Sequence, residues 1–175
     1  MPERKGLVIN SDYLLTPSNE ISFVITAGKR EEGKIFVPLT GEQFNALEAY
    51  QKSSREGFCK VVLSHGKKLI EWKSFFPLGA IDTREMEKKH EARAAPRRLG
   101  IGSLAHYAIT EYLCRKHGLQ DYQIKHEPSA SDERIRHLRS MGIDYSRTYS
   151  FPEYREIVRQ AVIKRFGSEP QLEMP

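Results

Sequence analysis

The sequence predicts a mixed α/β domain of the α+β kind, and two observations carry that prediction. The first half of the chain holds short apolar runs separated by turn residues, the pattern of paired β-strands. The second half holds longer runs in which apolar residues recur every three or four positions between capping residues, the pattern of helices. With 175 residues the chain is long enough for one substantial core, and we expect a single domain over residues 1–167.

Composition narrows the class of protein. Hydrophobic residues make up 39% of the chain and charged residues 29%, as in soluble globular proteins, and no apolar run is long enough to span a bilayer. No hydrophobic segment of signal-peptide type follows the first residues. The cysteines, Cys59 and Cys114, lie far apart without metal-ligand spacing, so a reduced cytoplasmic setting and no metal site are expected. The net charge of +5 suits an anionic cofactor or nucleic acid.

The elements of the first half are expected to be strands and one helix. Strands are predicted at 7–9, 21–26, 34–39, 58–64 and 67–76, with a turn at 10–12 and a hairpin loop at 28–33 that joins the second strand to the third. Thr40 and Gln43 stand at the spacing of a capping box and predict a helix that ends near residue 53. Its buried face is expected to carry Phe44, Leu47 and Tyr50.

The second half is expected to be mainly helical. A helix is predicted over 101–117, closed by Gly118, then a strand over 122–126 and a short helix over 131–141 closed by Gly142. The last helix begins at Ser150, with Glu153 at the capping-box offset, and a disordered tail is expected over 168–175. Residues 81–91 are very polar, and helix and strand both remain open for them.

One glycine turn stands out because it opens the predicted helix over 101–117. Arg97 and Arg98 precede Gly100 and Gly102, which are one residue apart. The first backbone N–H groups of a helix have no partner within the helix, so such a terminus favours anions, and glycine lets a phosphate approach closely.

Two phosphate-binding patterns fit this turn. Arg97-x-x-Gly100-x-Gly102 resembles the coenzyme A signature of the GNAT superfamily of acyl-coenzyme-A N-acyltransferases. Gly100-x-Gly102-x-x-Ala105 also fits the dinucleotide fingerprint, which needs a hydrophobic strand running into the first glycine. The preceding residues, 91–98, are basic and interrupted by a proline, which favours coenzyme A.

The resemblance to the GNAT superfamily extends over residues 92–143, where the expected order of strand, glycine turn, long helix, strand and short helix matches that family. It implies a central, mostly antiparallel mixed sheet flanked by helices, with acetyl-coenzyme A as co-substrate. The implied cofactor-binding residues are Ala92, Arg97, Arg98, Leu99, Gly100, Ile101, Gly102 and Ser103. Two departures concern catalysis: Leu138 stands where many members have a tyrosine, and a helix is expected where many end in strands.

The function that this resemblance implies is direct transfer of an acetyl or other acyl group from the coenzyme A thioester to a primary amine. Glu87, His90 and Glu91 lie upstream of the turn and are candidates for the base, and Tyr145 is a candidate for the acid at the leaving thiolate. Each of these side chains is equally typical of a solvated or structural position. The acceptor is open: a small molecule, a protein or an aminoacylated tRNA.

A second class of function stays open beside the enzyme. Basic residues on both sides of the long helix are able to line one face that binds nucleic acid or an acidic protein, as a non-catalytic module on a GNAT-like fold. These residues are Lys88, Lys89, Arg93, Arg97, Arg98, Arg134, Arg136 and Arg139. A plain solvated helix surface has the same pattern.

Overall fold

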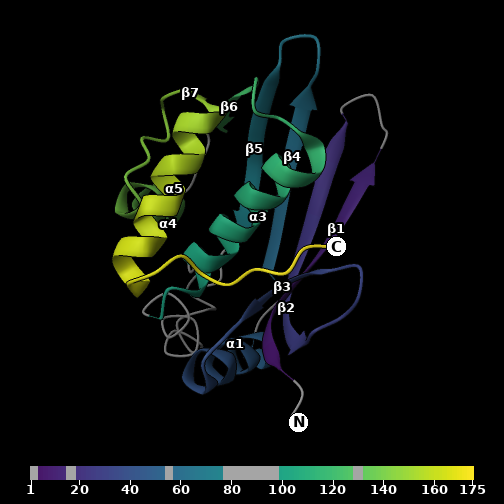
Figure 1. Ribbon diagram of the computed structural model, residues 1–175. Coiled ribbons are helices and arrows are strands. Elements are labelled where there is room, and N and C mark those ends of the chain that lie inside the picture. The colour runs from purple at the N-terminus through teal and green to yellow at the C-terminus, as the bar shows by residue number, and fades with distance from the viewer. Residues whose placement is uncertain (1–3, 15–18, 54–56, 77–98, 128–131) are drawn as a thin grey trace.

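The computed structural model describes residues 4–14, 19–53, 57–76, 99–127 and 132–175. It contains a seven-stranded sheet of order β3-β1-β2-β4-β5-β6-β7, in which every described pair except β5–β6 is antiparallel. Helices α3 and α5 lie in front of this sheet in Figure 1, α4 lies at the left partly behind α5, and α1 lies at the lower end of the sheet. The predicted α+β class is therefore confirmed.

The first three strands correct two predictions. Strand β1 (Lys5–Leu14) runs without a turn through 10–12, because it pairs with β2 (Glu20–Lys29) along its full length. Strand β3 (Ile35–Pro38) pairs with β1, so the predicted hairpin between the second and third strands is wrong. Pro38 ends this edge strand, where a missing N–H leaves no gap in the hydrogen-bond ladder.

The predicted capping box and the next hairpin are confirmed. The Thr40 N–H donates to Gln43 Oε1 at 3.0 Å, and the Gln43 N–H donates to Thr40 Oγ1 at 3.2 Å, at the start of α1 (Gly41–Ser53). The predicted apolar face of α1 is buried. Strands β4 (Gly57–Ser64) and β5 (Leu69–Phe76) then form an antiparallel hairpin with an irregularity between Lys60 and Val61.

Helix α3 (Ile101–His117) connects β5 to the parallel strand β6 (Gln123–His126). Its predicted bounds are confirmed, and Gly118 ends it with a φ of 60°. The sequence indicated a single apolar stripe, whereas residues on nearly every side of α3 are buried. The reason is its position: the helix lies between the sheet and α5, and the C-terminal segment crosses it (Figure 1).

The last elements follow the predicted helices closely. Helix α4 (Asp132–Ser140) is followed by Gly142 with a φ of 86°. Ser150 caps α5 (Phe151–Phe166), and its hydroxyl accepts a hydrogen bond from the Glu153 N–H at 3.3 Å. Strand β7 (Tyr149–Ser150) was not predicted, because two residues paired with β6 leave no periodic signal.

The C-terminal segment differs from the expected disordered tail over 168–175. Phe36 and Glu173 exchange two backbone hydrogen bonds of 2.9 Å in an antiparallel bridge on the edge strand β3. The Tyr107 hydroxyl donates to Glu169 Oε1 at 2.6 Å, which holds the segment over α3. Figure 1 shows this segment running from α5 across the front of α3 toward the first strands. The segment is ordered because the sheet edge supplies its backbone partners.

The core lies between one face of the sheet and the helices. Buried and half-buried residues alternate along β2 and β4, which leaves the opposite face of these strands partly exposed. Among the described residues, no helix combines the length and the apolar character that crossing a membrane requires.

Candidate functional site

The carboxyl end of β6 meets the middle of β5 beside α3. The ring centre of His106 on α3 lies 4.7 Å from that of Trp72 and 6.1 Å from that of His126. His126 is the last residue of β6 and lies opposite Trp72 of β5, and the Glu127 N–H donates to the Trp72 carbonyl at 3.0 Å. Crevices at such strand ends are the usual ligand sites of parallel sheets.

The first turn of α3 has the character predicted for an anion site. The first hydrogen bond of the helix runs from the Leu104 N–H to the Gly100 carbonyl at 3.1 Å, so the N–H groups of residues 101–103 precede the helical ladder. No acidic residue stands in this turn. The helix dipole therefore leaves the terminus positive.

Gly100 has a packing role that the sequence did not reveal. Its φ is 77°, and an added Cβ would lie 2.5 Å from Arg165 Nε and 2.6 Å from the Phe166 ring. The end of α5 thus fills the space that we expected to admit a phosphate, and the predicted close approach at Gly100 is corrected. At Gly102 the nearest atom to an added Cβ is His137 Cε1 at 3.6 Å, so the neighbours leave room there.

A small cationic pocket adjoins this turn. Its volume is about 290 Å³, and its lining residues are Ser103, Ser140, Met141, Ala161, Lys164 and Arg165. Ser103 is the third residue of α3 and only 6% exposed, so its hydroxyl belongs to a built wall rather than to open surface. In the part of the chain that the structure describes, the lining includes a lysine, an arginine and two hydroxyls and no carboxylate, which is a donor set that favours phosphate groups.

A buried cluster of imidazole and phenol groups lies next to this pocket, further along α3. The Tyr154 oxygen is 2.6 Å from His106 Nε2 and 2.7 Å from His126 Nε2. His106 Nδ1 is 3.4 Å from His137 Nε2 on α4. The indole of Trp72 stacks on His126 with ring centres 5.5 Å apart and lies 4.7 Å from the ring centre of His106. His106, His126, Tyr154 and Trp72 are all at most 3% exposed.

An ion-pair cluster fixes α5 against α3 beside these groups. Arg155 donates to Glu111 through Nε at 2.6 Å and Nη2 at 3.0 Å, and Arg115 Nη2 donates at 2.8 Å. Burial by itself raises the pKa of Glu111, but the hydrogen bonds from Arg155 and Arg115 together outweigh it and hold that pKa below its ordinary value. Burial, helped by the hydrogen bond to Glu169, raises the pKa of Tyr107 far above its usual range. The ion pair between Glu111 and Arg155 thus connects α3 to α5.

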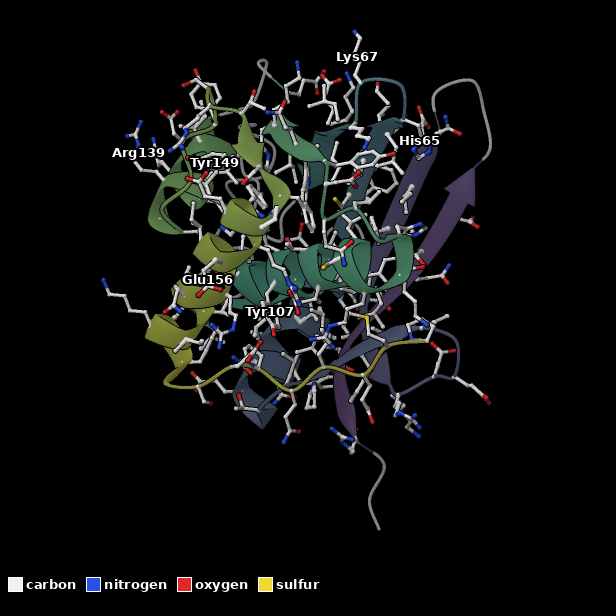
Figure 2. The ribbon with its side chains drawn as sticks, turned by 45° about the horizontal axis from the view of Figure 1, so that its top comes forward. His65, Lys67, Tyr107, Arg139, Tyr149 and Glu156 are labelled. Atoms are coloured by element: carbon white, nitrogen blue, oxygen red, sulfur yellow. The ribbon has the colours of Figure 1, made fainter. Side chains whose placement is uncertain are left out.

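Tyr145 is not brought to the first turn of α3. It lies in the loop after α4 and lines a pocket of about 410 Å³ with Arg139, Gly142 and Asp144. That pocket shares no lining residue with the cationic pocket. Figure 2 shows Arg139 and Tyr149 on the side of the molecule formed by α4 and α5, away from His65 and Lys67 of the β4–β5 hairpin.

The other predicted site residues divide into two groups. Glu87, His90, Glu91, Ala92, Arg97 and Arg98 lie outside the described residues, so their roles stay predictions. The start of α3 is formed by half-buried Leu99 and the buried residues Ile101 and Gly102. The Leu99 carbonyl accepts a hydrogen bond from Gln43 Nε2 at 3.1 Å. Arg136 and Arg139 are exposed, but the groove beside Arg139 also holds Glu153 and Glu156, so the described part of the basic face is mixed in charge.

His106 and Tyr154 are not among the predicted site residues. Their partners come from β5, β6, α4 and α5, so no spacing in the chain connects them. The one local signal is a histidine among apolar residues of α3, four positions after Gly102.

Comparison with protein-family models, with curated proteins and with solved structures found no match. Within the ranges that the structure describes, no group of three histidine, cysteine or acidic residues has the geometry of a metal site.

Proposed function

We propose that this protein is an N-acyltransferase that moves an acetyl or other acyl group from a coenzyme A thioester to a primary amine. The observation that carries the proposal is the cationic pocket at the first turn of α3, lined by Ser103, Lys164 and Arg165. From the glycine turn onward, the order α3, β6, α4 agrees with the order that the GNAT-like resemblance implies, and the strand expected before the turn lies outside the described residues.

The residues of the pocket fit a pyrophosphate chemically. Lys164 and Arg165 supply positive charge, the Ser103 hydroxyl supplies a donor, and the dipole of α3 adds to both. The end of α5 occupies the space beside Gly100, so binding depends on the turn over 101–103 and on the cations.

The burial of both cysteines agrees with direct acyl transfer, in which no thiol of the protein forms a covalent intermediate. Cys59 and Cys114 are 0% and 3% exposed, within β4 and α3. A nucleophilic thiol needs access to its substrate and an electropositive surrounding that favours the thiolate. The amine itself is therefore the attacking group, which requires that its proton be taken up nearby.

Titration calorimetry with acetyl-coenzyme A tests the proposal. We expect one site on the wild-type protein and weaker binding for Lys164→Gln, because one cation leaves the pocket. Lys116→Gln is the matched control, since Lys116 is also an exposed lysine near the end of a helix but stands at the far end of α3. Absence of binding to the wild type, or equal loss in the two variants, would remove the basis for the enzyme.

A further inference from the structure

The hydroxyl of Tyr154 has two close imidazole partners and one proton. His106 Nε2 is 2.6 Å from its oxygen and His126 Nε2 is 2.7 Å from it. The hydroxyl donates its proton to one of these nitrogens and accepts from the other, so at any moment one Nε2 carries a hydrogen and the other does not. In their neutral forms, the two imidazoles are therefore in opposite tautomers.

His137 connects the coupled tautomers of His106 and His126 to the half-buried edge of the cluster. Its Nε2 lies 3.4 Å from His106 Nδ1, on the other side of the same imidazole ring. In one arrangement every proton is donated from His126 toward His137. In the other arrangement every proton is donated from His137 toward His126. Shifting the three shared protons together converts the first arrangement into the second, and the imidazoles stay neutral only if one proton enters at His126 Nδ1 and one leaves His137.

We propose that His126, Tyr154, His106 and His137 form a proton relay between the carboxyl end of β6 and the outer helix α4. A proton that arrives at His126 Nδ1 drives His126 Nε2–H to Tyr154, the Tyr154 hydroxyl proton to His106 Nε2, and the His106 Nδ1 proton to His137 Nε2. His137 then carries the positive charge, and no charge stays on the buried groups. Each donor loses one proton as it gains another, so the relay is balanced.

The surroundings suit transfer over these four groups. Each comes from a different element: β6, α5, α3 and α4. Trp72 of β5 stacks on His126 and packs at a tilt of 38° against His106, so its indole contacts both inner imidazoles. The next titratable ring is Tyr149 of β7, whose centre is 6.0 Å from that of Tyr154, and its hydroxyl is engaged by the Asp144 N–H at 2.9 Å. The tilt between His106 and His137 is 36°, with ring centres 5.6 Å apart.

The use of the relay in acyl transfer rests on the proposed function, whereas the relay itself does not. The attacking nitrogen loses a proton when the carbon–nitrogen bond forms, and the sulfur gains one when the carbon–sulfur bond breaks. The relay holds the first proton as charge on His137 and returns it through His126 to the leaving thiolate. One bond forms, one breaks, and the four side chains end as they began.

Nuclear magnetic resonance of imidazole nitrogens in the free protein tests the relay without any acyl donor. As the pH falls and His137 takes up a proton, its Nε2–H donates to His106, so His126 is expected to change from the Nε2–H to the Nδ1–H tautomer. In Tyr154→Phe the ring remains and the hydroxyl is lost, so His126 no longer follows His137. Tyr149→Phe is the matched control, because it removes a hydroxyl beside the relay, and there the response is retained.

If Tyr154→Phe does not fold, His137→Gln provides a second test. This variant has no ionisable group at the half-buried end of the relay, so the change of the His126 tautomer with pH is expected to vanish. The relay is overturned if the His126 tautomer stays constant across the titration of His137, or if its response persists in Tyr154→Phe or His137→Gln. A confirmed relay in a protein that binds no acetyl-coenzyme A would end the acyltransferase proposal alone.

Discussion

A carboxylate placed at position 103 separates the packing role of the first turn of α3 from a role in anion binding. Ser103 is the third residue of the helix, where an acidic side chain interacts favourably with the helix dipole by about 0.3–1 kcal/mol. Lys164 and Arg165 line the same pocket and compensate the new charge. We therefore expect Ser103→Asp to fold in the absence of ligand, because the helix dipole and the two cations offset part of the cost of burying a carboxylate at a position that is 6% exposed.

The same carboxylate opposes a phosphate in the pocket. At a separation of about 5 Å and an effective dielectric constant of about 20, two unit charges repel by about 3 kcal/mol. Since about 1.4 kcal/mol corresponds to a tenfold change, the affinity for acetyl-coenzyme A is expected to fall more than about 100-fold. A ligand at about 100 times its dissociation constant stabilises the wild type by about 2.7 kcal/mol, but stabilises the variant by less than about 0.5 kcal/mol.

Thermal unfolding with and without acetyl-coenzyme A measures this difference. For a chain of 175 residues, about 2.7 kcal/mol corresponds to a rise of about 5–10 °C in the melting temperature. Gln120→Asp adds the same charge at an exposed position beyond the opposite end of α3 and is expected to keep the full rise. If Ser103→Asp also keeps it, the pocket does not hold the pyrophosphate and the reasoning fails.

Three further predictions concern stability. Gly100→Ala is expected to lower the free energy of unfolding by at least about 1–2 kcal/mol, because Gly100 has a positive φ and an added Cβ would meet α5. Gly102→Ala is expected to raise the free energy of unfolding by about 0.5–1 kcal/mol, because alanine favours a helix over glycine and the neighbours leave room. Urea unfolding at fixed pH measures both changes. Glu111→Gln is expected to cost about 2 kcal/mol at pH 7. The pKa of Glu111 is depressed in the folded protein, so ionised Glu111 stabilises the fold above the ordinary pKa of 4.5. This stabilisation is lost as the pH falls through the lower pKa of the folded state. The difference in free energy of unfolding between wild type and Glu111→Gln is therefore expected to shrink as the pH is lowered, which urea unfolding at several acidic pH values measures. Removing 168–175 deletes the bridge to Phe36 and is expected to lower the melting temperature and to speed amide exchange in β3; unchanged exchange there would contradict this.

Local chemistry explains which elements the sequence predicted well. The capping boxes at Thr40 and Ser150 were found because each places its hydrogen-bonding partners three residues apart in the chain. The bounds of α3 followed from a glycine at each end. Pairing of strands is different: β3 follows β2 in the chain but pairs with β1, and nothing within residues 28–39 encodes which neighbour the sheet will supply.

The relay was beyond sequence reasoning for the same physical reason. His106, His126 and His137 share no spacing in the chain that indicates a common site. The hydroxyl that connects them is supplied by Tyr154, whose position in the apolar stripe of α5 predicts only burial. A site assembled from separate elements becomes visible only when the sheet and the helices are in place.

The two glycines of the turn show why a motif gives less information than its residues do. Gly100 is required by its positive φ and by the approach of Arg165 and Phe166, so its presence needs no ligand. Gly102 has no such requirement: the nearest atom to an added Cβ is in ordinary van der Waals contact, and a glycine within a helix lowers stability. Packing therefore accounts for the first glycine and not for the second, and the second lies on the same turn as Ser103. Substitutions at Gly102 and Ser103 therefore test pyrophosphate binding more directly than substitutions at Gly100.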